Sequence, residues 1–167
     1  MDTVRRTVEY ARSLEKKHDK CFRFTITTNG MLLNEENMEY INREMSNVVL
    51  SLDGRPAVND HMRPTPGGQG SYEIIVPKFQ KLVEGRGTKD YYVRGTFTRE
   101  SLDFAQDVMH LADLGFRHVS VEPASGPSDD PFAIREEDLA QVEQEYERLA
   151  KELLERERPV NFFHFNV

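Results

Sequence analysis

The stretch Asn47–Gly54, which reads NVVLSLDG, constrains this chain more than any other segment. Its three apolar residues, Val48–Leu50, are followed at once by Ser51, Asp53 and Gly54. A fully buried parallel strand that opens into a ligand site has this pattern: apolar bulk, then hydrogen-bonding groups, then a residue that permits an unusual turn. Ligands of α/β folds collect at the carboxyl ends of such strands. Ser51 and Asp53 are therefore the first candidate site residues.

The rest of the chain alternates strand and helix patterns. Period-two alternation and apolar runs predict strands at 21–28, 48–50, 91–98 and 118–122, with a further strand beginning in 159–167. Apolar spacing and capping residues predict helices at 2–17, from Asn34, at a start or kink near Pro77, from Ser101, and at 135–158. Proline and glycine predict loops at 55–71 and 124–132. This order predicts an α/β fold with a parallel sheet, in which the 21–28 strand is an unpaired edge.

Composition excludes several classes of protein. The 167 residues suffice for one domain with a core but fall short of the roughly 250 of an eight-stranded α/β barrel. A net charge of -7 without a basic stripe argues against a nucleic-acid partner. No apolar run is long enough to cross a membrane and residues 1–20 are charged throughout, so we expect a cytoplasmic protein. The single cysteine, Cys21, excludes a disulfide, a zinc finger and an iron–sulfur cluster held within this chain, and no metal ligands are assigned.

Polar residues recur where the predicted strands end. Carboxyl ends of parallel strands share one edge of a sheet, so these side chains are expected to face a common mouth. They offer an amide, a hydroxyl, two carboxylates and guanidinium groups, a set that suits a small zwitterionic ligand with hydroxyls. The candidates are Asn29, Gly30, Ser51, Asp53, Arg94 and Glu122.

The order of several short motifs resembles a known family. The chain is similar to radical S-adenosylmethionine (SAM) enzymes, and more narrowly to peptide maturases with a SPASM-type domain that form thioether crosslinks in the cysteine-rich SCIFF peptides. TNG and SLDG each recur in many branches of that family, but the combination in this order is more specific. The segments are FTITTNG at 24–30, VVLSLDG at 48–54, HMR at 61–63, GSY at 70–72, YVRGTFTR at 92–99, SVEP at 120–123 and NFFHF at 161–165.

The resemblance implies a partial (β/α)6 barrel, TIM-like and with outer helices, of which residues 1–167 would be an incomplete core domain. In that family a CxxxCxxC loop holds a [4Fe-4S] cluster, and SAM bound to the cluster yields a 5′-deoxyadenosyl radical that abstracts hydrogen from the substrate. The substrate implied here is a ribosomal precursor peptide. The cluster-binding part and the SPASM part are expected outside this chain, on its amino and carboxyl sides respectively.

Individual roles also follow from the resemblance. Asn29 and Gly30 would flank SAM, and Ser51 and Asp53 would contact its ribose or methionine portion. Lys78 matches the position at which relatives carry a basic residue for the SAM carboxylate. Arg94 matches a polar position in the barrel, and Glu122 would lie near SAM or substrate. No residue is assigned a catalytic role.

Departures from the family leave alternatives open. The three-cysteine loop and the GGEP-type segment are absent, and Cys21 cannot replace three ligands. The chain is therefore expected to be a piece of a radical SAM enzyme, or a truncated, inactive module that only binds peptide or SAM. A less favoured alternative is a non-radical α/β-barrel lyase that uses Asp53, Lys78 or Glu122 as acid or base. His61 and Arg63 stay undecided between a solvated loop and a functional role.

Overall fold

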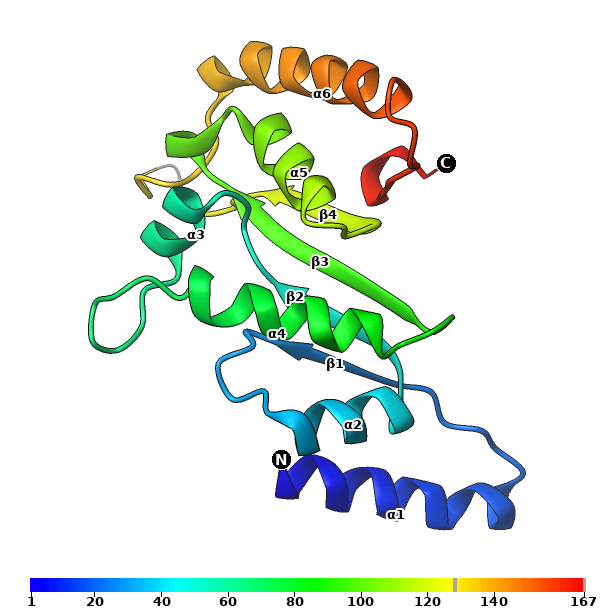
Figure 1. Ribbon diagram of the computed structural model, residues 1–167. Helices are drawn as coiled ribbons and strands as arrows, with labels where there is room; N and C mark the ends of the chain where they lie inside the picture. Colours follow the sequence, from blue (N-terminus) through cyan, green and yellow to red (C-terminus); the bar gives the residue numbers. More distant parts are fainter. Residues whose placement is uncertain (128, 167) are drawn as a thin grey trace.

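A computed structural model describes residues 1–127 and 129–166 of the chain. Its described strands form one five-stranded sheet in the order β1-β2-β3-β4-β5, and every neighbouring pair is parallel. The predicted α/β fold with parallel strands is confirmed, and the sheet is open, with β1 at one edge and β5 at the other (Figure 1). The strands are β1 (Phe24–Thr28), β2 (Met45–Ser51), β3 (Asp90–Phe97), β4 (His118–Pro123) and β5 (Asn161–Phe162).

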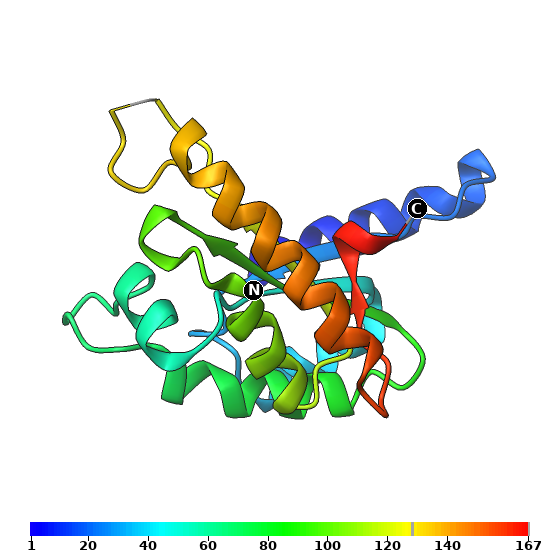
Figure 2. The ribbon, with the colours of Figure 1, turned by 90° about the horizontal axis from the view of Figure 1, so that it is seen from above.

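Helices follow the strands along the outer side of the curved sheet. Seen from above, α4 and α5 lie on the same side of β3, and α6 crosses over α5 (Figure 2). In the part of the chain that the structure describes, no helix has the length and apolar character needed to span a membrane. The helices are α1 (Asp2–His18), α2 (Glu35–Glu44), α3 (Pro56–Met62), α4 (Tyr72–Glu84), α5 (Phe104–Asp113) and α6 (Leu139–Leu154).

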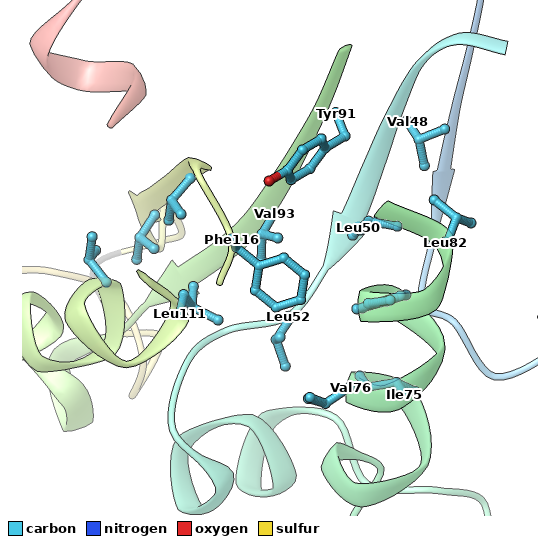
Figure 3. Close-up of a cluster of buried hydrophobic side chains, with 14 of the residues drawn as sticks. Val48, Leu50, Leu52, Ile75, Val76, Leu82, Tyr91, Val93, Leu111 and Phe116 are labelled. Atoms are coloured by element: carbon cyan, nitrogen blue, oxygen red, sulfur yellow. The ribbon is translucent and has the colours of Figure 1, made fainter. Parts of the chain in front are cut away.

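The two faces of the sheet differ in chemistry because side chains alternate along each strand. Val48, Leu50 and Val93 are fully buried and point toward α4 and α5, where Phe116 packs against them (Figure 3). The alternate positions carry mostly polar side chains, such as Ser51 on β2 and Arg94 on β3, and none of these belongs to the apolar core of the described chain. We call this second side the open face.

Three sequence predictions about helix starts need correction or refinement. The predicted loop 55–71 contains α3, because Pro56 occupies the first turn, where a missing N–H costs nothing. Helix α4 starts at Tyr72 and contains Pro77, so of the two predicted alternatives the start near Pro77 is wrong. Ser101 does not cap α5; it lies in a short 3-10 turn and bonds Thr98, and α5 begins at Phe104. By contrast, Asn34 caps α2 as predicted, since its side chain accepts from the Asn37 N–H.

The carboxyl-terminal elements are shorter than predicted. The helix expected at 135–158 is a 3-10 turn at Glu136–Asp138 followed by α6, which ends at Leu154. The strand expected within 159–167 is reduced to the two residues of β5, after which Phe163–Phe165 form a 3-10 turn. Residue 167 and residue 128 of the predicted 124–132 loop lie outside the described residues.

Candidate functional site

Asp53 lies just beyond the carboxyl end of β2 and is almost fully buried, with 2% exposure. Its two carboxylate oxygens accept from Arg63 Nε at 2.7 Å and Nη2 at 2.9 Å, which is a bidentate ion pair. One of the same oxygens also accepts from the Thr96 backbone N–H at 2.9 Å. The carboxylate is therefore already satisfied by the protein, and its direct effect is to fix the Arg63 guanidinium at the end of the sheet.

A buried polar network holds the loop that follows Arg63. The Asn59 side chain is fully buried, accepts weakly from the Asp53 N–H at 3.4 Å and donates to Ser71 Oγ at 3.1 Å. Ser71 Oγ in turn donates to the Arg63 carbonyl at 2.7 Å. Asp60 completes the network, because one carboxylate oxygen accepts from the backbone N–H groups of Ser71 and Tyr72. The loop is thus fastened at both ends, close to Asp53.

The turn after β2 is fixed to α5 by a second set of charges. The carboxylate of Asp107 accepts from the backbone N–H and Nε of Arg55, both at 2.8 Å, and Asp103 accepts from Nη2 at 2.8 Å. Hydrogen bonding to Asp107 raises the pKa of Arg55 above its usual value, so this cation is permanent. Gly54 has φ +146°, and a Cβ there would collide with the Asp107 side chain. Glycine is therefore required at this position of the SLDG motif.

A cavity of about 420 Å³ lies between the turn after β1 and the loop 63–71. We call it the β1-end cavity. Asn29 and Met31 form one wall, while Arg63, Thr65 and Ser71 contribute to the other. The exposed Asn29 side chain and the partly exposed Arg63 guanidinium give this cavity an amide and a fixed cation. Such a pair can bind the carboxylate of a small polar ligand.

Arg63 was not among the predicted ligand-binding residues. The HMR segment was the available signal, but a loop of that composition does not reveal that Asp53 holds its arginine. The predicted Asn29 does line the β1-end cavity, whereas Ser51, Arg94 and Glu122 lie on the open face outside it.

Gly30 and Lys78 shape the turn after β1. Gly30 has φ +78°, and a Cβ at this position would lie 2.6 Å from the Phe79 ring. Lys78, on α4, donates through Nζ to the Met31 carbonyl at 2.9 Å and, more weakly, to the Gly30 carbonyl at 3.4 Å. Both residues therefore support the wall that carries Asn29.

Arg94 and Glu122 form an ion pair on the open face. Arg94 Nη2 donates to Glu122 Oε2 at 2.9 Å, and the other carboxylate oxygen accepts from Ser120 Oγ at 3.1 Å. The Arg94 side chain remains 56% exposed, so it is available to a molecule that lies on this face. Ser51 pairs with Arg94 in the sheet register, which places it beside this ion pair.

The described residues offer no ligand set for a metal ion or an iron–sulfur cluster. No group of three or more His, Cys, Asp or Glu side chains gathers among residues 1–127 and 129–166. Cys21 is exposed and precedes β1, at the opposite end of that strand from the β1-end cavity. A [4Fe-4S] cluster therefore does not fit on ligands of this chain.

Comparison with known proteins identifies the fold. No protein-family model matches the sequence, and no curated protein matches it. The solved structure of anSMEcpe with bound AdoMet and the Kp18Cys peptide matches 96% of this chain and 46% of its own, with a TM-score of 0.79 and 13% identity. Streptococcus suis SuiB bound to S-adenosylmethionine matches 83% of this chain and 32% of its own, with a TM-score of 0.59 and 20% identity. The fold is that of a radical SAM core.

Two further solved structures have a similar fold. SuiB bound to its precursor peptide SuiA matches 83% of this chain and 30% of its own, with a TM-score of 0.60 and 21% identity. A domain of a pyruvate-formate lyase-activating enzyme from Bacteroides vulgatus matches 93% of this chain and 91% of its own, with a TM-score of 0.53 and 16% identity. The chain thus spans less than half the length of anSMEcpe and SuiB. It has the open parallel sheet of a radical SAM core.

Proposed function

We propose that this chain is the central part of the radical SAM core of a peptide-modifying enzyme and that it binds SAM at the β1-end cavity. The observation that carries this proposal is the coincidence of two features. The fold matches SAM-bound anSMEcpe over 96% of the chain, and a polar cavity with a fixed cation lies at the carboxyl end of its first strand. That end is where ligands of α/β folds bind.

The residues of the cavity suggest how SAM is held. Arg63 binds the carboxylate of the methionine portion, and Asp53 acts through Arg63 by fixing its guanidinium. Asn29 hydrogen-bonds the same portion, while Gly30 and Lys78 hold the turn that carries it. Ser51 faces the ribose from the open face. In the complete enzyme, an iron–sulfur cluster held by ligands outside this chain would supply the radical chemistry.

A peptide substrate fits the open face. The Kp18Cys peptide is bound in one anSMEcpe structure and the precursor peptide SuiA in a SuiB structure. In this chain Arg94 and Glu122 lie on the open face with both charges accessible, so they contact the substrate. The order of motifs in the sequence favours a ribosomal precursor peptide that receives thioether crosslinks.

One variant tests the role of Arg63 in SAM binding. Arg63→Lys keeps the charge but loses the two parallel bonds to Asp53, so the cation is no longer fixed in the cavity. We expect SAM affinity, measured by isothermal titration calorimetry on the full chain, to fall about tenfold. The matched control is Arg148→Lys on α6, whose arginine pairs with Glu152 on the surface. Equal SAM affinity in both variants, or no SAM binding by the unmodified chain, contradicts the proposal.

A second function is favoured by the missing cluster ligands. An inactive module that binds peptide or SAM without cleaving SAM needs only the cavity and the open face, which the described residues supply. The coding sequence on either side of the chain separates the two functions: a CxxxCxxC loop upstream supports the radical enzyme, and the absence of one supports the inactive module. If the loop is present, reconstitution of the longer protein with iron and sulfide that yields a cluster and SAM cleavage excludes the inactive module.

A further inference from the structure

A second cavity opens on the open face, at the amino-terminal end of the strands. We call it the amino-end cavity; it measures about 430 Å³. Each strand of the sheet contributes to its lining, through Thr25, Asn47, Tyr92, His118 and Asn161. None of these side chains lines the β1-end cavity or contacts Asp53. The cavity is therefore separate from the site proposed for SAM.

The Asn47 side chain has an unused hydrogen-bonding group. Its Oδ1 atom is covered, yet no donor contacts it among the residues that the structure describes. Buried amide oxygens are normally paired, because leaving one unpaired costs free energy. Asn47 lines the cavity, so a ligand N–H there can pair with this oxygen once the side-chain amide rotates toward it.

His118 supplies a complementary donor. Asn166 Nδ2 donates to Asn161 Oδ1 at 2.7 Å, so it is the Nδ2 of Asn161 that faces His118 Nδ1 at 3.3 Å. A ring nitrogen that accepts in this way leaves the proton of a neutral imidazole on Nε2. The ring is also held edge-on against Tyr91 and Tyr92, at centroid distances of 5.1 and 5.7 Å. The cavity therefore combines an acceptor on β2 with a positioned donor on β4.

An acceptor and a donor that line one cavity can pair with the two polar groups of a peptide unit. We propose that the amino-end cavity binds one backbone amide of an extended peptide, with Asn47 Oδ1 accepting its N–H and His118 Nε2 donating to its carbonyl. The proposal rests on the proposed function in that the peptide crosses the open face toward the SAM end. It adds an anchoring site for the substrate backbone, away from the reacting atoms.

The length of the sheet sets the spacing of this anchor. Asn47 and Ser51 are four residues apart on β2, a distance of about 13 Å at about 3.3 Å per residue. An extended peptide covers that distance with about four residues. The peptide residue that reaches the SAM end is therefore about four positions away from the anchored amide.

The test uses the full chain and an uncharged probe, the blocked peptide acetyl-(Gly-Ser)4-amide. Titration followed by nuclear magnetic resonance is expected to shift the Asn47 side-chain amide and the His118 Nε2 signals saturably. Asn47→Leu removes the acceptor and is expected to weaken binding at least tenfold, and Asn47→Ser, which retains a small polar side chain, weakens it less. Gln144→Leu is the matched control, because Gln144 is an exposed amide on α6 and its loss is expected to leave binding unchanged.

Three outcomes overturn the proposal. Linear shifts, or shifts elsewhere on the surface, mean that the peptide has no site in this cavity. Equal affinities of Asn47→Leu and Gln144→Leu mean that Asn47 is not its acceptor. Concentration-dependent shifts of Asn47 without peptide mean that a second copy of the chain occupies the cavity. SAM binding is measured on the same samples, so loss of the proposed function appears there and loss of the anchor appears in the peptide titration.

Discussion

Several polar side chains at the candidate site already have hydrogen-bond partners within the protein and so have little capacity left to bind a ligand. Asp53 has the sequence position of a ligand-binding carboxylate, but Arg63 and the Thr96 N–H occupy its oxygens. Similarly, the ammonium group of Lys78 donates to two backbone carbonyls, those of Gly30 and Met31. The non-radical lyase alternative needs Asp53, Lys78 or Glu122 as an acid or base, and Glu122 too has protein partners, Arg94 and Ser120. Their contribution to a site is therefore through the residues that they hold in place.

A single residue, Tyr146, is also expected to make the stability of the fold depend on pH. Burial, and then the charge of Glu122, raise the pKa of Tyr146, whose hydroxyl contacts His164 Nδ1 at 2.8 Å. The unfolded chain therefore loses this proton first, at pH about 10, and the stability that Tyr146 contributes is complete below that pH and lost as pH rises toward the folded value. We expect the melting temperature to fall less steeply for Tyr146→Phe than for the unmodified chain as the pH is raised from neutral to strongly alkaline. Tyr10→Phe, at an exposed position, serves as the control; parallel curves for all three proteins contradict the prediction.

At the scale of elements, α4 depends on a distant residue for its start. Its N-cap, Ser71, makes no side-chain capping bond, and the first N–H groups are satisfied by Asp60 of α3. The same network includes Asn59 and the carbonyl of Arg63. The start of α4 and the wall of the β1-end cavity are therefore one connected structure.

Removing the carboxylate of Asp60 tests this connection. Asp60→Ala deprives the Ser71 and Tyr72 N–H groups of their acceptor, and a lost cap costs about 1 kcal/mol. We expect faster amide hydrogen exchange at those two residues and a slightly lower free energy of unfolding. Asp113→Ala is the control, since Asp113 makes only a surface ion pair with Arg156. Unchanged exchange at Ser71 and Tyr72 shows that the cap does not operate in solution.

For the whole molecule, the open sheet leaves β1 as an edge strand. In the described sheet β1 has a partner strand on one side only, and its Thr25 and Thr27 side chains are exposed. An edge strand without charge is a template for pairing with another chain. This edge was predicted from the sequence and is present in the described sheet.

Charge at the edge is expected to reduce association. Thr27→Lys adds a charge to β1 without touching the buried face, and natural edge strands avoid pairing by the same means. We expect sedimentation velocity to show concentration-dependent association of the unmodified chain and less of it for Thr27→Lys. Thr7→Lys, on the exposed side of α1, controls for net charge. A monomeric unmodified chain, or equal effects of both substitutions, contradicts the prediction.

Local patterns predicted most of the elements. Alternation of Phe24 and Ile26 with threonines identified β1, and the buried set on α5, including Phe104 and Val108, followed from helical spacing. Helix starts were less predictable, because α4 is capped by Asp60 from another element. The candidate site was predictable only in part. Asn29 was predicted and lines the β1-end cavity, whereas Arg63 is held at the cavity by an ion pair with Asp53, ten residues away, which no local pattern indicates.

The sequence by itself determined the α/β class, the parallel sheet and the polar ends of its strands, since periodicity and turn residues act over a few neighbouring positions. Tertiary structure alone decided which polar groups remain available to a ligand. Asn47 lies within β2 and Asp53 just after it, yet Asp53 is satisfied by protein donors and Asn47 has an oxygen without a donor in the described chain. That difference depends on which distant donors the fold brings within hydrogen-bonding distance, and no local pattern encodes it.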